Sequence, residues 1–168
     1  MNRIYCAIGK ITEVTQLIEV ALGEICEASE IVKEFGRHAK MTVQDYEQAK
    51  SDALYLKEKM QTMTFGALIS VIYESKSLSY DEINELKALL EKRNYFTHEY
   101  FKYTKFEGEG EAFILEEFEA LKEYLAKLKK MENKLEIIKS SKINQLNYLA
   151  AKAGLWFWGK DEKLFKWY

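Results

Sequence analysis

Hydrophobic residues recur every three or four positions along most of the chain, which is the spacing of one face of an α-helix. The first such stripe consists of Ile4, Ile8, Ile11, Val14, Leu17, Ile18, Ala21, Leu22 and Ile25. It predicts a long amphipathic helix, which is expected to run to about Glu34 because Gly36 supplies a stop signal.

Three hydroxyl residues predict the starts of the following helices. Thr42, Thr64 and Ser79 each precede a new apolar pattern, where a hydroxyl can accept a bond from a free N–H of the first turn. Ser79 also lies three residues before Glu82, which is the capping-box spacing, and Leu78 is available as the hydrophobic staple. The helix that begins there is expected to run to about residue 103.

The last third of the chain predicts a loop, a long helix and an aromatic tail. Residues 105–111 (KFEGEGE) combine two glycines with a charge cluster, which is typical of a loop. Residues 112–141 predict a long helix, and residues 142–154 either continue it or form a short last helix. The tail, 155–168, holds all three tryptophans and is expected to pack across one end of the bundle, with an interface contact or stacking on RNA bases as alternatives.

Composition supports a single all-α domain over residues 1–168. The chain has no proline and eight glycines, so little in it breaks helices. We expect an up-and-down bundle of four or five helices. The formal net charge of −2 gives no global basic field, so any nucleic-acid binding would depend on a local patch.

Cysteine usage and hydropathy predict a cytoplasmic protein. Cys6 and Cys26 are too few for a disulfide framework, and both are expected to be buried, reduced thiols. The first residues lack the uninterrupted apolar segment of a signal peptide, and no apolar run approaches the ~20 residues of a membrane span.

In the segment EKRNYFTHEYF, residues 91–101, polar residues take over positions on a helix face that is apolar up to Leu90. The stripe of Ile83, Leu86, Leu89 and Leu90, extended by helical steps, meets Arg93, Thr97, Tyr100 and Phe101. On a regular helix Asn94 and His98 share one edge, and Tyr100 lies almost directly above Arg93. An arginine in that position needs an anion, a carboxylate or a cleft, because an unpaired buried charge is costly. A structural Arg–Glu pair beside a hydrogen-bonded core histidine is the alternative.

The same residues match a known motif. Arg93, Asn94 and His98 form R-x4-H with a polar residue directly after the arginine, and Tyr100 extends the match to R-x4-H-x-Y. In this respect the chain resembles the HEPN superfamily, whose signature lies near the end of a helix in an all-α bundle. The longer form of the motif is similar to that of toxins in HEPN/MNT toxin–antitoxin pairs.

The resemblance implies a metal-independent endoribonuclease that acts as a toxin or in phage defence. Two protomers would line one cleft as a homodimer, His98 would be the general acid and base, and Arg93 would clamp the phosphate. Asn94 would orient His98 or the phosphate, and Tyr100 would position the substrate. The expected products are a 2′,3′-cyclic phosphate and a 5′-hydroxyl. A nucleotidyltransferase-type antitoxin is an implied partner, and in related toxins the corresponding tyrosine receives AMP.

Basic residues at two places are candidates for RNA binding. Arg37 and His38 lie in the turn GRHAK, which is otherwise a solvated connection between helices. Lys92 and Lys102 flank the motif and could contact RNA phosphates in the same way.

Other classes of function leave different signatures. Neither His38 nor His98 follows a glutamate at the spacing of a di-iron site, and no H-E-x-x-H or phosphate-binding glycine loop is present, so no metal or cofactor is predicted. Two alternatives to the enzyme stay open. One is a non-catalytic HEPN-like module that binds a nucleotide or a partner and assembles with a nucleotidyltransferase. The other is a purely structural bundle.

Overall fold

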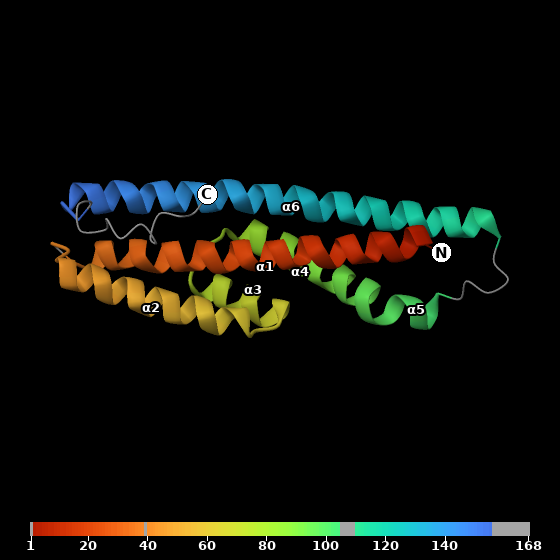
Figure 1. Cartoon of the computed structure of the whole chain (residues 1–168), viewed down its shortest axis with the longest axis horizontal. Coiled ribbons are helices and arrows are strands. Elements are labelled where there is room, and N and C mark those ends of the chain that lie inside the picture. The colour runs from red at the N-terminus through yellow and green to blue at the C-terminus, as the bar shows by residue number, and fades with distance from the viewer. Residues whose placement is uncertain (1, 39, 105–109, 156–168) are drawn as a thin grey trace.

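The first and the last helix are the longest elements, and they lie side by side in the same direction (Figure 1). The computed structural model describes residues 2–38, 40–104 and 110–155. The helical elements of these residues are α1 (Asn2–Arg37), α2 (Val43–Gln61), α3 (Phe65–Glu74), α4 (Tyr80–Asn94), the π-helical turn η1 (Tyr95–Glu99), α5 (Tyr100–Tyr103) and α6 (Glu111–Lys152). Because α4, η1 and α5 follow one another without a break, the described chain is a bundle of five helices without a strand, which confirms the predicted all-α class.

Two buried clusters hold the bundle together, one in each half of its length. The larger cluster joins the first part of α1 to α3, α4, η1 and α6, whereas the smaller joins the end of α1 to α2 and the end of α6. Since α6 has 42 residues, it is about 63 Å long and spans both clusters. None of the described helices combines the length and apolar character that crossing a membrane requires.

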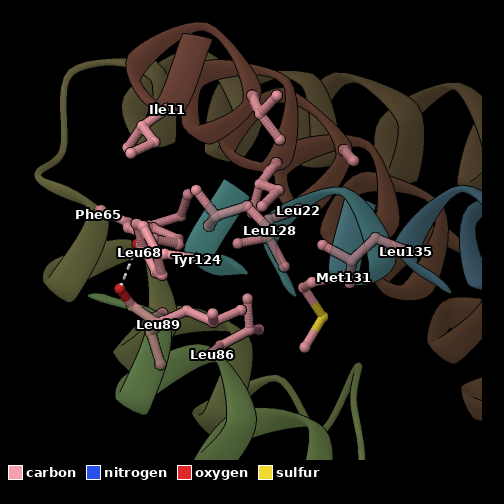
Figure 2. Packing of buried hydrophobic residues seen from close by; sticks show 14 of the residues in the cluster. Ile11, Leu22, Phe65, Leu68, Leu86, Leu89, Tyr124, Leu128, Met131 and Leu135 are labelled. Atoms are coloured by element: carbon pink, nitrogen blue, oxygen red, sulfur yellow. Dashed lines mark hydrogen bonds between the residues drawn. The ribbon is translucent and has the colours of Figure 1, made fainter. Parts of the chain in front are cut away.

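The larger cluster fixes the position of α4, the helix that leads to the motif. Leu86 and Leu89 of α4 pack against Leu128 and Met131 of α6 (Figure 2). The hydroxyl of Tyr124, which is fully buried in α6, donates to the carbonyl of Leu89 over 2.7 Å (Figure 2). This bond ties the C-terminal half of α4 to α6.

All three predicted helix caps are confirmed. Thr42 forms a capping box with Asp45, and the Thr64 hydroxyl accepts from the third N–H of α3. Ser79 accepts from the N–H of Glu82 over 3.3 Å, and the Glu82 carboxylate accepts from the N–H of Ser79 over 2.8 Å. The start of the motif helix is therefore encoded locally.

Some local expectations are wrong. α1 continues through Gly36 to Arg37 rather than ending near Glu34. For residues 142–154 the first of the two alternatives is confirmed, since residues 142–152 continue α6. Cys26 is buried, but Cys6 is exposed because it faces away from the stripe of Ile4 and Ala7. Most of the predicted loop, residues 105–109, and residues 156–168 of the tail lie outside the described residues.

We expect Ser79→Ala to lower the free energy of unfolding by about 1 kcal/mol. The Ser79 hydroxyl accepts one of the two bonds of the capping box, and alanine removes that acceptor. Urea denaturation followed by circular dichroism would measure the change. Ser140→Ala, at an exposed position inside α6, is the matched control and should leave stability within about 0.5 kcal/mol of the parent. Equal effects of the two substitutions would contradict the cap's role.

Candidate functional site

The helix that carries the motif changes its winding at the motif itself. Beyond Asn94 the chain forms the π turn η1, in which the N–H of Tyr100 donates to the carbonyl of Tyr95. In a regular α-helix, residues five apart are rotated by about 140° from each other, so Arg93 and His98 would point in different directions. A π turn takes up one additional residue and therefore brings these two side chains to the same side.

Arg93 and His98 meet at the partly exposed surface over this turn. Arg93 Nη1 lies 3.5 Å from His98 Nε2, and it donates to Asn94 Oδ1 over 3.2 Å. The Thr97 hydroxyl donates to the carbonyl of Arg93 over 2.9 Å and so occupies a backbone acceptor inside the turn. Because arginine has no acceptor, the contact with His98 requires a lone pair on Nε2. The three polar residues of the motif thus form one cluster.

The guanidinium of Arg93 is only partly satisfied by the protein. Its Nε is buried and has no hydrogen-bond partner, and in the described part of the chain no carboxylate lies within ion-pair distance of it. The alternative of a structural Arg–Glu pair is therefore not what these residues form. The guanidinium is always charged, and its partly exposed end has no carboxylate beside it among the described residues, so it is suited to bind an anion from solution.

Glu19 of α1 faces the same region and was not identified from the sequence. Burial raises the pKa of the Glu19 carboxyl, and the positive charge of Arg93 offsets part of this rise. Glu19 comes from a helix far away in the chain, and nothing in its local pattern distinguishes it from other glutamates of α1. Its carboxyl and the phenol of Tyr124 are both groups whose pKa the charge of Arg93 lowers.

Tyr100 enters the core rather than the cluster of Arg93 and His98. Its side chain is 1% exposed, and its ring packs against Phe96, which in turn packs against Tyr124. The Tyr100 hydroxyl donates to Glu117 Oε2 of α6 over 2.9 Å. Burial and the Glu117 carboxylate both raise the pKa of Tyr100, so the hydroxyl is held in its protonated form. In this conformation Tyr100 anchors the turn to α6.

Exposed aromatic rings lie on the elements that carry the cluster and at the start of α1. Tyr5 at the start of α1 stacks on Phe101 of α5 with ring centroids 4.9 Å apart, although the two residues are 54% and 44% exposed. Tyr95, on the π turn, is 39% exposed. The elements that carry the polar cluster therefore also expose apolar rings.

The candidate RNA-binding residues fall into two separate places. Lys92 precedes Arg93, with its Nζ 5.9 Å from the centre of the Tyr124 ring, and Lys102 lies on α5. Arg37 and His38 lie at the other end of α1, where both are within ion-pair distance of Glu34. The structure thus brings the two lysines near the motif and leaves Arg37 and His38 apart from it.

No metal-binding arrangement accompanies the cluster. Across residues 2–38, 40–104 and 110–155, no three side chains of histidine, cysteine, aspartate or glutamate converge as ligands would. The cluster itself offers the guanidinium of Arg93, the imidazole of His98 and the amide of Asn94. Comparisons of the chain with protein-family models, with curated proteins and with solved structures found no match.

We expect a double-mutant cycle of Tyr100→Phe and Glu117→Ala to give a coupling energy of about 1 kcal/mol, because each substitution alone removes the same part-buried hydrogen bond. Urea denaturation of the four proteins would measure it. Tyr95→Phe removes the same oxygen from an exposed ring of the same turn and is expected to be neutral. Additive effects of the two substitutions would show that the bond does not contribute.

We expect Glu19→Gln to be more favourable for stability at neutral pH than in acid. Because burial raises the pKa of Glu19 in the folded state, its contribution to stability is fully present below the unfolded pKa of about 4.3 and is lost as the pH rises through the folded value. Glutamine avoids that loss. Urea denaturation at both pH values would test this, with Glu13→Gln at an exposed position of α1 as the control. A pH-independent effect of Glu19→Gln would contradict it.

Proposed function

We propose that this protein is a metal-independent endoribonuclease of the HEPN type, which acts as a toxin or in phage defence. The observation that carries the proposal is the π turn that brings Arg93 within 3.5 Å of His98 at a partly exposed surface. π turns occur frequently at functional sites, and the winding here brings together the two residues that the motif specifies. The resemblance of the motif to the HEPN signature supplies the reaction.

The proposed reaction is an attack of the ribose 2′-oxygen on the neighbouring phosphorus. A bond from phosphorus to the 2′-oxygen forms while the bond to the 5′-oxygen breaks, which leaves a 2′,3′-cyclic phosphate and a 5′-hydroxyl. His98 accepts the proton of the 2′-hydroxyl or supplies the proton to the leaving oxygen. Arg93 binds the phosphate and stabilises the charge that develops on it, and Asn94 holds the guanidinium in place through its 3.2 Å bond.

A homodimer would complete this site. One motif contains a single histidine, whereas the reaction uses both an acid and a base, so two motifs in one cleft would supply the pair. The exposed rings of Tyr5, Tyr95 and Phe101 support this arrangement, because apolar surface beside a polar cluster is what an interface buries. Lys92 and Lys102 would contact the RNA backbone on either side of the cleft.

The non-catalytic alternative keeps the same cluster but uses it differently. The exposed end of the Arg93 guanidinium would bind the phosphate of a nucleotide or of a partner without cleaving a bond. In that case the chain would assemble with a nucleotidyltransferase or another enzyme. Turnover distinguishes the two hypotheses.

We expect the purified protein to cleave a mixture of tRNA and mRNA in the presence of EDTA, and to leave 2′,3′-cyclic phosphate ends. His98→Ala should reduce cleavage by about 10²–10⁴-fold, as the loss of a general acid or base does. Arg93→Ala should reduce it by about 10²–10³-fold, as the loss of a stabilising donor does. Gel analysis of end-labelled RNA would measure the rates, and circular dichroism would verify that each variant is folded.

The chain provides a matched control for each variant. Arg37→Ala and His38→Ala remove the same kinds of side chain from the opposite end of α1, so they should leave kcat unchanged and at most raise KM through a lost RNA contact. If a folded parent is inactive, the non-catalytic hypothesis is favoured, and binding of a labelled nucleotide to the parent and to Arg93→Ala tests it. If His98→Ala cleaves as fast as the parent, the proposed mechanism is wrong.

A further inference from the structure

A small pocket lies where the end of α2 and the start of α3 meet the middle of α1. Gly23 of α1, Met60 of α2 and Leu68 of α3 line it, and its volume is about 240 Å³. Val20 at its edge is 57% exposed, whereas Met60 and Leu68 are each 3% exposed and form its base. Sites for drug-sized ligands have about 300–1,000 Å³, so this pocket is suited to a smaller group of one or two rings.

The walls of this pocket are largely apolar and adaptable. Met60 and Met63 contribute thioethers, which are flexible and make favourable contacts with aromatic rings. Gly23 contributes no side chain, although a Cβ placed there would lie 3.9 Å from Lys57 Cγ, which is an ordinary contact. Packing therefore does not require glycine at this position, and the missing side chain leaves the pocket open. A flat ring can contact apolar groups on these walls.

Polar side chains of the pocket complement a ring that carries hydrogen-bonding groups. Gln16 and Gln61 line the pocket from α1 and α2, and both are exposed. Each amide offers donors and an acceptor, and the carboxylate of Glu19, which also lines the pocket, offers acceptors. Proteins recognise an unstacked nucleobase by packing side chains on its faces and by hydrogen-bonding its edge. The pocket provides both kinds of contact.

The pocket adjoins the polar cluster of the motif. α3, which supplies Leu68, packs on α4. A Cβ placed at Gly66 would lie 3.4 Å from Leu90 Cδ2, and Leu90 is less than one turn before Arg93. α1 contacts both α3 and η1, and its Glu19 lines the pocket while the charge of Arg93 acts on its carboxyl. An anion bound to Arg93 would therefore lie close to the wall of the pocket.

From these observations we propose that the pocket receives the base of a nucleotide whose phosphate lies on Arg93, and that the amides of Gln16 and Gln61 select the base. The inference rests on the proposed function, because it takes the anion at Arg93 to be a nucleotide phosphate. An RNA chain and a free mononucleotide share this chemistry. In the endoribonuclease, the pocket would set the preference for the base next to the cleaved bond.

Photocrosslinking tests the pocket without requiring cleavage. Single-stranded RNA that carries 4-thiouridine or 6-thioguanosine would be irradiated with the His98→Ala protein, which is expected to leave the RNA intact, and mass spectrometry would locate the attachment. We expect it in the segment 60–63. Gly23→Leu, which fills the pocket, should abolish this crosslink, whereas Gly9→Leu, at an exposed glycine of the same helix, should not. Crosslinks that map only elsewhere would overturn the proposal.

Cleavage rates test the selection of the base. DNA oligonucleotides that contain one ribonucleotide, either A, C, G or U, would be compared by kcat/KM. We expect the parent to favour one base by about tenfold or more, as one good pair of hydrogen bonds allows. The double substitution Gln16→Ala and Gln61→Ala should abolish this preference with helicity unchanged, and Gln48→Ala, at an exposed position of α2 outside the pocket, should retain it. An unchanged preference in the double variant would overturn the role of the amides.

The two readouts separate this inference from the proposed function. Cleavage without a base preference, together with crosslinks outside the segment 60–63, would overturn the base site and leave the endoribonuclease standing. A crosslink in that segment without cleavage by the folded parent would support the base site and contradict the enzyme. In that case, competition by a free mononucleotide as strong as that by RNA would identify the mononucleotide as the ligand.

Discussion

The contact between α1 and α6 is the interaction on which the rest of this structure depends. Each helix carries an apolar stripe along most of its length, and neither could bury that stripe against a shorter element. When the two helices lie side by side, each half of the pair still has an apolar surface that other helices must cover. α2 covers one of these surfaces, and α3 together with the α4–η1–α5 rod covers the other. Helical propensity alone would not hold elements this long in one arrangement.

The candidate site follows from how the rod leaves that packing. Leu89 is tied to Tyr124 and Tyr100 to Glu117, so the helix is attached to α6 on both sides of the π turn. Between those two attachments the chain accommodates one residue more than an α-helix would, and Arg93 and His98 share a side as a result. The buried residues Tyr124 and Tyr100 therefore support the site, because they attach the rod to α6 on both sides of the π turn that brings Arg93 and His98 together.

Local signals in the sequence were sufficient for the helices and their starts. The caps at Thr42, Thr64 and Ser79 depend on residues three positions apart, and such pairs can be read directly from the chain. The prediction that α1 ends near Glu34 was wrong, because a glycine ends a helix only where the backbone must turn. α1 continues through Gly36 to Arg37, which forms an ion pair with Glu34.

The geometry of the site could be predicted only in part. The polar change at Arg93 was visible in the stripe, and its half-buried position agrees with that prediction. The π turn was not visible, because it arises from attachments to Glu117 and Tyr124 of another helix. For this reason a regular helical wheel placed Tyr100 above Arg93, whereas its side chain lies in the core. Glu19 was missed for the same physical reason, since only the folded chain brings α1 to the motif.

The length of α6 has a consequence for how the size of this protein is measured. At about 63 Å, that one helix is about twice the diameter of a small globular domain. A rod-like particle diffuses more slowly and elutes earlier from a sizing column than a sphere of the same 19.7 kDa mass. An early elution volume would therefore be expected even from a single chain. Light scattering or sedimentation equilibrium, which report mass without assuming a shape, are the methods that can count its subunits.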